Sequence, residues 1–431
     1  MPDTRMTRRL AAMLAARLNE AHFDEVRDGR NPRGKRWEIR TLLTAITVAM
    51  AAGAKSLAEA ERVTATMPRA ARRWLGIERR VPDTTLRDAL GRVCPQDLVS
   101  RLHSVVLAAH RRKALQPVEA LPFGVVSLDG KAFSISGCDD FYAQRQTQNE
   151  QGPLVGVVRT VTATLTSSPA RPCIDVTPIP ASTNEVGYFR RALEQLVATY
   201  GHLDLFRLVT YDAGACSLGN ATAVRERNLH YLFGLKGTQP TLYREAKLWL
   251  GSHTAAQAAA QTEDLTGGKI VLRRLYLGPC TVEPEGWTHL RTVLRIESET
   301  FDAHGNRVAL ENRYFISSLA TDRLSPEQWM YLVRAHWGVE TTHQILDVAL
   351  QEDEHPWIES EPRAALVVAV IRRIVYTMLA LFRSVTQRSD ERRAVPWRSL
   401  LDDIRDAMLI LADHHLSGLR RRVHRLKPAP A

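Results

Sequence analysis

The first 116 residues have the hydrophobic spacing of α-helices. Apolar side chains recur every three to four residues over 39–50, and Gly53 follows as a stop signal. Similar patterns predict further helices at 56–67, 70–75, 84–93 and 96–113. The chain is therefore expected to begin with an all-helical segment.

The periodicity changes after two prolines in the stretch 115–122. Short buried runs then predict strands, and amphipathic runs predict helices between them. The expected order is three strands, helix, strand, helix, strand and helix, at 123–128, 155–165, 173–179, 183–200, 205–211, 215–227, 231–235 and 241–250. This order is typical of a mixed α/β domain.

Residues 262–319 lose the helical pattern and alternate apolar with polar positions between turns, which predicts a small β-rich insertion. A long helix is expected next, over 327–354, with Ser325 as its N-cap and Pro326 as its first residue. Two more helices, at 362–385 and 397–414, and a basic tail at 419–427 complete the chain.

The predicted helix over 327–354 carries a polar stripe. At about 100° per residue, one narrow face holds His336, Glu340, His343 and Asp347, and Glu354 follows two turns later. The stripe has two interpretations, a solvated helix face or one wall of an active site.

The chain is basic, with 58 Lys and Arg against 47 Asp and Glu in 431 residues, a net charge of +11. Such a surplus suits an anionic polymer, above all nucleic acid. Arginines crowd the middle of the helical segment, among them Arg72, Arg73 and Arg87. They form either a solvated basic face or a DNA-binding surface, such as one of helix-turn-helix type, that attracts phosphates.

The five cysteines are scattered and form no C-x-x-C pair, which argues against a zinc module or a disulfide framework. The most apolar run, 364–382, has Arg372 and Arg373 at its middle and is interrupted too early to cross a bilayer. No signal peptide is recognisable at the N-terminus. We expect a cytoplasmic protein without a membrane partner.

Two aspartates, Asp129 and Asp212, each follow a predicted strand. Taken singly, Asp129 could belong to an Asp-Gly turn and Asp212 could cap a helix. Together with Glu340 they could instead form an anionic cluster at one edge of a sheet. Because such carboxylates repel one another, a divalent cation is the natural compensation, and hard oxygen ligands suit Mg²⁺, with Mn²⁺ as a substitute.

A competing metal site is weakly indicated. Glu340 with His343 and Glu352 with His355 both form Glu-x-x-His, the motif of di-iron helix bundles. Both pairs lie on one predicted helix rather than on facing helices, which argues against a di-iron site. A zinc hydrolase is less favoured still, since His336, Glu340 and His343 do not form His-Glu-x-x-His.

Several short motifs occur in an order that resembles the DDE transposases of bacterial insertion sequences, in particular the branch of H-repeat-associated proteins. These motifs are Ser-Leu-Asp-Gly-Lys at 127–131, Thr-Asn-Glu at 183–185, Val-Thr-Tyr-Asp-Ala at 209–213, Leu-Lys-Gly-Thr-Gln at 235–239, Tyr-Phe-Ile-Ser-Ser at 314–318 and Arg-Ala-His-Trp-Gly-Val-Glu at 334–340. The helical segment likewise resembles the transposase-associated domain of this family.

The resemblance implies an α/β fold with an RNase H-like mixed-sheet catalytic core, a β-rich insertion and a preceding all-helical domain. It implies that Asp129, Asp212 and Glu340 are the catalytic and metal-binding triad. It also implies that Lys236 contacts phosphate and that the DNA path near Glu340 is lined by Arg334, His336, Trp337 and His343.

The chain departs from related branches at several places. His336 stands where an Arg is usual four residues before the Glu, and Asp347 stands where a Lys is usual seven residues after it. The expected Gly-His-Gly-Arg-like motif reads Gly-Gly-Lys-Ile at 267–270, and Thr341 replaces an Asn.

We therefore expect three parts: a DNA-binding helical domain at 1–116, a catalytic domain at 117–385 with its insertion at 262–319, and a C-terminal helix and tail at 386–431. The expected function is cleavage at insertion-sequence ends and transfer of the 3′-hydroxyl strands to target DNA by a two-metal mechanism. Double-stranded DNA is the expected partner, a homodimer the expected synaptic unit and the nucleoid the expected place. The alternatives are a domesticated DNA-binding protein without catalysis and an RNase H-like nuclease without strand transfer.

Overall fold

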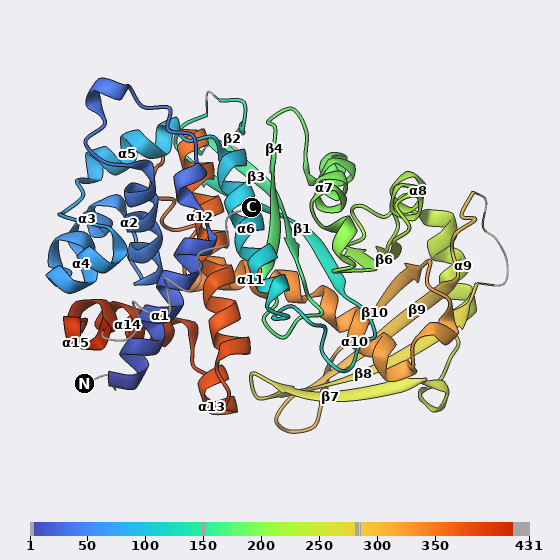
Figure 1. Cartoon of the computed structure of the whole chain (residues 1–431). Coiled ribbons are helices and arrows are strands. Elements are labelled where there is room, and N and C mark those ends of the chain that lie inside the picture. Colours follow the sequence, from blue (N-terminus) through green and yellow to red (C-terminus); the bar gives the residue numbers. More distant parts are fainter. Residues whose placement is uncertain (1–3, 139, 148–151, 281–283, 285, 417–431) are drawn as a thin grey trace.

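The computed structural model describes residues 4–138, 140–147, 152–280, 284 and 286–416 (Figure 1). The predicted basic tail at 419–427 lies outside the described residues. A helical region occupies one side of the molecule and a large twisted sheet the other (Figure 1). The fold is mixed α/β with an RNase H-like core, as expected from the sequence.

The helices are α1 (Thr4–Glu20), α2 (Ile39–Ala51), α3 (Leu57–Thr66), α4 (Arg69–Leu75), α5 (Asp83–Arg92), α6 (Pro95–Arg111), α7 (Glu185–Tyr200), α8 (Leu218–Glu226), α9 (Pro240–Leu250), α10 (Pro326–His336), α11 (Gly338–Val348), α12 (Pro362–Leu381), α13 (Asp390–Arg393), α14 (Trp397–Ile410) and α15 (Asp413–Leu416). The strands are β1 (Val125–Ile135), β2 (Ala143–Thr147), β3 (Leu154–Thr164), β4 (Cys173–Ile179), β5 (Leu208–Tyr211), β6 (His230–Leu235), β7 (Ala260–Thr266), β8 (Lys269–Pro279), β9 (Thr292–Phe301) and β10 (Arg307–Ser317).

The strands form one sheet in the order β2-β3-β1-β5-β6-β10-β9-β8-β7, with β4 paired to β3. The three central strands β1, β5 and β6 are parallel, and the other pairs are antiparallel. The predicted β-rich insertion is thus continuous with the core sheet, because Tyr314–Ser317 at the end of β10 pairs with β6. That long-range pairing rigidly connects the insertion to the strands that carry the site.

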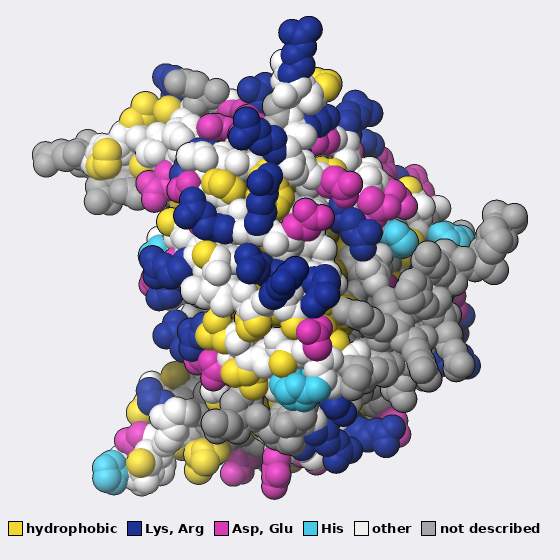
Figure 2. Space-filling model, turned by 60° about the vertical axis from the view of Figure 1, so that its left-hand side comes forward, with side chains coloured by type: hydrophobic (Ala, Val, Ile, Leu, Met, Phe, Trp, Pro, Cys, Tyr) yellow, Lys and Arg dark blue, Asp and Glu magenta, His cyan; other side chains and the backbone are white. Residues whose placement is uncertain are grey.

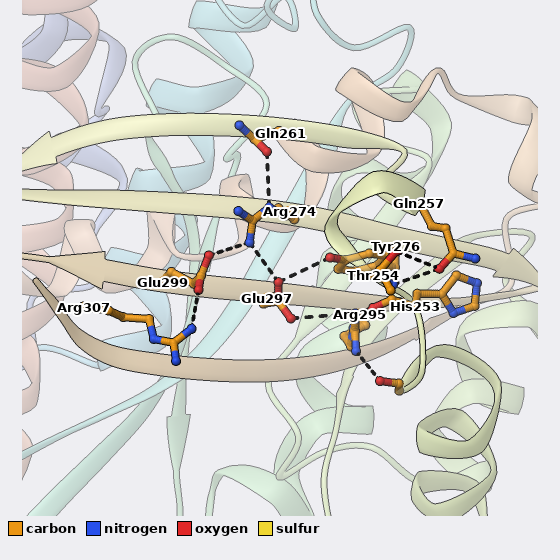
Figure 3. A network of polar contacts seen from close by, with 11 residues as sticks. His253, Thr254, Gln257, Gln261, Arg274, Tyr276, Arg295, Glu297, Glu299 and Arg307 are labelled. Carbon is orange, nitrogen blue, oxygen red and sulfur yellow. Dashed lines mark hydrogen bonds and ion pairs between the residues drawn. The ribbon is translucent and has the colours of Figure 1, made fainter. Parts of the chain in front are cut away.

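A ladder of ion pairs ties the strands of the insertion together (Figure 3). Arg274 lies directly opposite Glu297 in the register and donates to it at 3.1 Å. Glu299 accepts from Arg274 and, at 2.8 Å, from Arg307 on the next strand. Because opposite charges face each other across neighbouring strands, they stabilise the pairing where little apolar surface is buried.

Helix α12 is the centre of the helical region. It packs against α2, α5 and α6 on one side and β4 on the other. Residues 362–386 are long and apolar enough to cross a membrane, but the 18-residue apolar stretch within them is entirely buried inside the protein. The apolarity of α12 is therefore explained by its place in the core.

The structure corrects two details of the predicted elements. The helix expected over 327–354 is two helices: α10 begins with the predicted Ser325 cap, its last turn tightens at Trp337, and α11 ends at Val348. A Cβ at position 338 would lie 3.0 Å from Thr166 Cγ2, so glycine allows the junction to pack closely on the turn that follows β3. Glu354 consequently lies in a turn beyond α11 and not on the polar stripe.

The second correction concerns β1. The strand does not end at Asp129 but continues to Ile135, since the whole segment pairs with β3. Asp129 therefore projects from the middle of a long strand, at the point where its parallel neighbour β5 stops.

Candidate active site

The sheet register places Asp129 beside Asp212. In the parallel pair β1–β5, Ser127 lies opposite Thr210, and each aspartate follows two residues later. Side chains two residues apart point to the same face of a strand, so the aspartates share that face. Asp212 is fixed at the strand end by the Gly214 N–H, which donates to its Oδ1 at 2.9 Å.

Helix α11 lies against β1 and β3 and contributes Glu340 to the same region. Burial, and then the Asp129 carboxylate, raise the pKa of Asp212 above its ordinary value. The pKa of Glu340 is raised by the same two causes, with a smaller contribution from Asp212. The three carboxylates therefore interact as one electrostatic group.

The cluster is open rather than closed. Among the residues that the structure describes, no three His, Cys, Asp or Glu side chains converge tightly enough to ligate a single ion as they stand. Mutual repulsion favours this spacing when the carboxylates are ionised without a counter-charge. The donor set fits a divalent cation, because three carboxylates supply hard oxygen donors on one face, and the pKa values of two of them, Asp212 and Glu340, are raised.

A buried chain of hydrogen bonds lies beneath the carboxylates. Ser127 Oγ is 2.8 Å from both Thr166 Oγ1 and Thr210 Oγ1, and Thr210 Oγ1 is 2.9 Å from His336 Nδ1. Burial lowers the pKa of His336 to about 4, so its ring is neutral at pH 7. With 5% of its surface exposed, His336 does not line the DNA path as expected but supports the floor of the site.

His343 is also buried, and it faces Asp129 rather than open DNA. Its Nδ1 is 3.3 Å from Asp129 Oδ2, while Asp129 Oδ1 accepts from the Gly130 N–H at 2.8 Å. The two contacts fix both carboxylate oxygens of Asp129. This contact favours a role for His343 in positioning Asp129 over the expected place on the DNA path.

Replacement of His343 by Ala is expected to raise the Mg²⁺ concentration required for half-maximal DNA cleavage by about 10- to 100-fold, the size seen when a partner of a metal ligand is lost. The cause would be a loosened Asp129 carboxylate. Metal titrations of the cleavage rate would measure it, with the exposed His202→Ala as the matched control. Equal metal dependence in both variants would contradict a role for His343 in positioning Asp129.

Asp347, the last member of the stripe, is neutralised by a buried lysine. Lys131 Nζ lies 2.7 Å from Asp347 and 3.0 Å from Asp353. Asp347 is therefore engaged in an ion pair at the base of the site. The competing di-iron interpretation is wrong, because Glu352 is fully buried and paired with Arg373 on α12.

Cationic side chains surround the carboxylates. Lys236 is exposed and lowers the pKa of Asp212, which places its charge close to that aspartate. Arg313 on β10 lies with its guanidinium 5.0 Å from the centre of the Trp337 ring and lowers the pKa of Glu340. Arg334 is half-buried and paired with Asp264 on β7 at 2.9 Å.

A groove of about 450 Å³ opens between α10 and the strands β7 and β8, and it reaches the first turn of α11 at Gly338 and Thr341. Three guanidinium groups and two aromatic rings are among its lining, from Arg171, Arg273, Arg334, Tyr331 and Trp337. Within the groove, Arg273 and Arg334 share the single carboxylate of Asp264. Burial and the neighbouring Arg334 lower the pKa of Arg273. The lining holds three arginines and one glutamate, Glu327, so it carries a surplus of positive charge.

The arginines expected to bind DNA in the helical region lie on α4 and α5, on the side of the molecule away from β6 and α8 (Figure 1). Arg73 and Arg87 are exposed, whereas Arg72 is half-buried and Arg73 pairs with Asp413 at 3.4 Å. Figure 2 shows many Lys and Arg side chains on this face, with acidic side chains between them. The surface is basic but partly neutralised.

Arg273 and Arg313 were not among the residues expected at the site from the sequence, and Lys131 was noted there only as part of the Ser-Leu-Asp-Gly-Lys motif. Lys131 follows Asp129 by two residues on one strand, so alternation alone could have placed it on the same face. Arg313 directly precedes the Tyr-Phe-Ile-Ser-Ser motif. Arg273 has no sequence signal, since the groove that it lines is formed with α10, a distant segment of the chain.

Comparison with known proteins assigns the family. A model described as "Transposase DDE domain" matches residues 126–376, and one described as "DDE_Tnp_1-associated" matches residues 20–105. The first match covers more than half of the chain. The chain belongs to the DDE transposase family of insertion sequences, whose members act on DNA with divalent metal ions.

Two curated relatives are similar over shorter stretches. "Putative transposase YncI" of Escherichia coli O157:H7 is 27% identical over 163 residues, 35% of this chain and 40% of the relative. An "Uncharacterized protein in dhlA 3'region" of Xanthobacter autotrophicus is 30% identical over 132 residues, 28% of this chain and 43% of the relative. The chain thus spans about two fifths of the length of each of these relatives.

Proposed function

We propose that this protein cleaves DNA at the ends of an insertion sequence and joins the freed 3′-hydroxyls to target DNA. The observation that carries the proposal is the electrostatic group formed by Asp129, Asp212 and Glu340 at the edge of an RNase H-like sheet. We propose these three as the catalytic and metal-binding residues, with Mg²⁺ as the ion and Mn²⁺ as a substitute.

The carboxylates would hold the metal, and the residues around them would keep the carboxylates in place. Bound there, a divalent ion supplies charge that stabilises phosphate oxygens and activates a water or 3′-hydroxyl as nucleophile. His343 orients Asp129, and the neutral His336 supports Thr210 without adding a charge under the cluster. Lys236 and Arg313 lie where they can attract a phosphate to the cluster.

We propose that double-stranded DNA lies across the carboxylates, with its flank in the groove beside α10. Arg334 and Trp337, both expected on the DNA path, line that groove together with Arg273. The helices within residues 1–116, with α14 packed on α1, would add phosphate contacts through Arg72, Arg73 and Arg87. Reaction at two element ends requires two active sites, so we propose a homodimer in the synaptic complex, acting in the cytoplasm on the nucleoid.

A labelled element end, incubated with the protein, Mg²⁺ and a supercoiled plasmid, tests the proposal. Metal-dependent cutting followed by covalent capture of the labelled end by the plasmid is the expected result, and EDTA is expected to abolish both. Cutting without capture would favour a nuclease, and DNA binding without cutting would favour a domesticated binding protein.

Replacement of Arg273 by Ala is expected to weaken DNA binding at every sequence and to reduce the slope of log K against log salt by about one, as for the loss of one phosphate contact. Fluorescence anisotropy at several salt concentrations would measure the slope. Arg207→Ala, at the start of β5 and therefore at the opposite end of that strand from Asp212, is the control. An unchanged slope for Arg273→Ala would exclude this groove from the DNA path.

A further inference from the structure

The Thr-Asn-Glu motif at 183–185 has no role in the site as described so far. It forms the start of α7, where the Asn184 side chain accepts from the Gly187 N–H at 2.9 Å and so caps the helix. A Cβ at position 187 would lie 2.7 Å from Thr183 Oγ1, so Gly187 allows the turn to fold tightly on itself. The motif therefore holds Glu185 in a defined place, as the first residue of a helix of 16 residues.

The start of α7 fits between the two aspartates. A Cβ built on Gly130 would lie 2.8 Å from Glu185 Cγ and 3.3 Å from its carboxyl carbon, so Glu185 lies directly on the backbone next to Asp129. The same Gly130 donates its N–H to the Asp129 carboxylate. A Cβ built on Gly214 would lie 3.4 Å from Val186 Cγ2 and 3.1 and 3.5 Å from the two carboxylate oxygens of Asp212. The residue after Glu185 therefore lies close to Asp212.

The carboxylate of Glu185 is available for a ligand. Within the described part of the chain it has no hydrogen-bond or ion-pair partner. A glutamate at a helix start is often explained by the helix dipole alone. That explanation does not account for the glycine at 130, which leaves room for the Glu185 side chain beside a carboxylate.

A second and independent observation points to a missing ligand at this place. The hydroxyl of Tyr211, a residue with 2% of its surface exposed, is buried without a hydrogen-bond partner among the described residues. The Tyr211 ring packs edge-on against Phe189 of α7, the helix that begins with Glu185, with the ring centres 5.3 Å apart. A buried hydroxyl without a protein partner is expected to bond a water or another ligand.

We propose that Glu185 is a fourth carboxylate of the active site and supplies an oxygen ligand, directly or through a water, to a divalent cation held on the α7 side of Asp129 and Asp212. The inference rests on the proposed function, since it extends the same metal site. It assigns the Thr-Asn-Glu motif the task of presenting that ligand, and it explains why position 130 is glycine.

Mn²⁺ binding to the full-length protein, followed by electron paramagnetic resonance and calorimetry without DNA, tests the inference. Wild type is expected to bind two ions, and Glu185→Gln is expected to lose one of them or to bind it at least about tenfold more weakly. Glu194→Gln, an exposed residue on the same helix, is the matched control and should bind as wild type does.

Gly130→Ala provides a second variant that leaves the Glu185 charge in place. Because the added Cβ would displace the Glu185 side chain, this variant is expected to reproduce the weakened binding, with circular dichroism to verify folding. Two ions bound with unchanged affinity in Glu185→Gln would overturn the inference and leave the proposed function intact. Equal and negligible binding in wild type and Asp129→Asn would overturn both.

Discussion

Replacement of Asp129, Asp212 or Glu340 by its amide, one at a time, is expected to reduce DNA cleavage by at least about 10²- to 10³-fold, the loss typical for one group that stabilises a transition-state charge. The amide keeps the shape of the side chain but removes an anionic oxygen ligand. A time course of cleavage with Mg²⁺ measures the effect. Glu354→Gln, which lies off the cluster, is the control and should cleave as wild type does.

The Asp212 and Glu340 variants are expected to be more stable than wild type when metal is absent. The pKa values of Asp212 and Glu340 are raised in the folded protein, so these carboxylates lower stability progressively as the pH rises through their folded pKa values. Asp212→Asn should therefore raise the melting temperature at pH 7 and should lose that advantage near pH 4. A variant that lost both cleavage and stability would indicate a structural role for the aspartate.

Replacement of Arg373 by Met is expected to lower the free energy of unfolding by about 3–5 kcal/mol, because it leaves the buried Glu352 carboxylate without its partner. Arg373 and Glu352 are both completely buried and form an ion pair between α12 and the turn after α11. Urea denaturation would measure the loss. Arg363→Met, exposed at the start of α12, should change stability by no more than about 0.5 kcal/mol.

Replacing both partners provides the decisive comparison. The double variant Arg373→Met/Glu352→Leu is expected to recover most of the stability lost by Arg373→Met, since neither member of the Arg373–Glu352 pair is left without the other. Burial would raise the pKa of Glu352, but Arg373 and then Arg372 outweigh it and hold that pKa below its ordinary value. At pH values above the ordinary pKa of a glutamate, the pair therefore stabilises the folded protein. This stabilisation is lost as the pH falls through the folded-state pKa of Glu352. Additive losses in the double variant would contradict this account.

Much of the fold could be predicted because local patterns determine it. The helices before residue 116, the α/β alternation and the Ser325 cap all follow from spacing and capping residues. The break at Trp337 was missed because the polar stripe continues smoothly across it. The continuation of β1 past Asp129 was missed because an Asp-Gly pair is typical of turns, whereas pairing with β3 keeps the strand extended.

The partners of the site residues could not be predicted, since they depend on contacts between distant segments. His336 reaches Thr210 across 126 positions, and Lys131 reaches Asp353 across 222. A helical stripe shows which residues share a face but not whether that face is open or buried. For this reason the sequence placed His336 and His343 on the DNA path, whereas both are buried beneath or beside Asp129.

A Mn²⁺ anomalous difference map from crystals of the full-length protein tests the central claim most directly. The three carboxylates are expected to draw together around the ion, with Asp129, Asp212 and Glu340 each contributing an oxygen at about 2.1 Å. A map in which Mn²⁺ binds elsewhere, or in which the carboxylates stay apart at saturating metal, would contradict it.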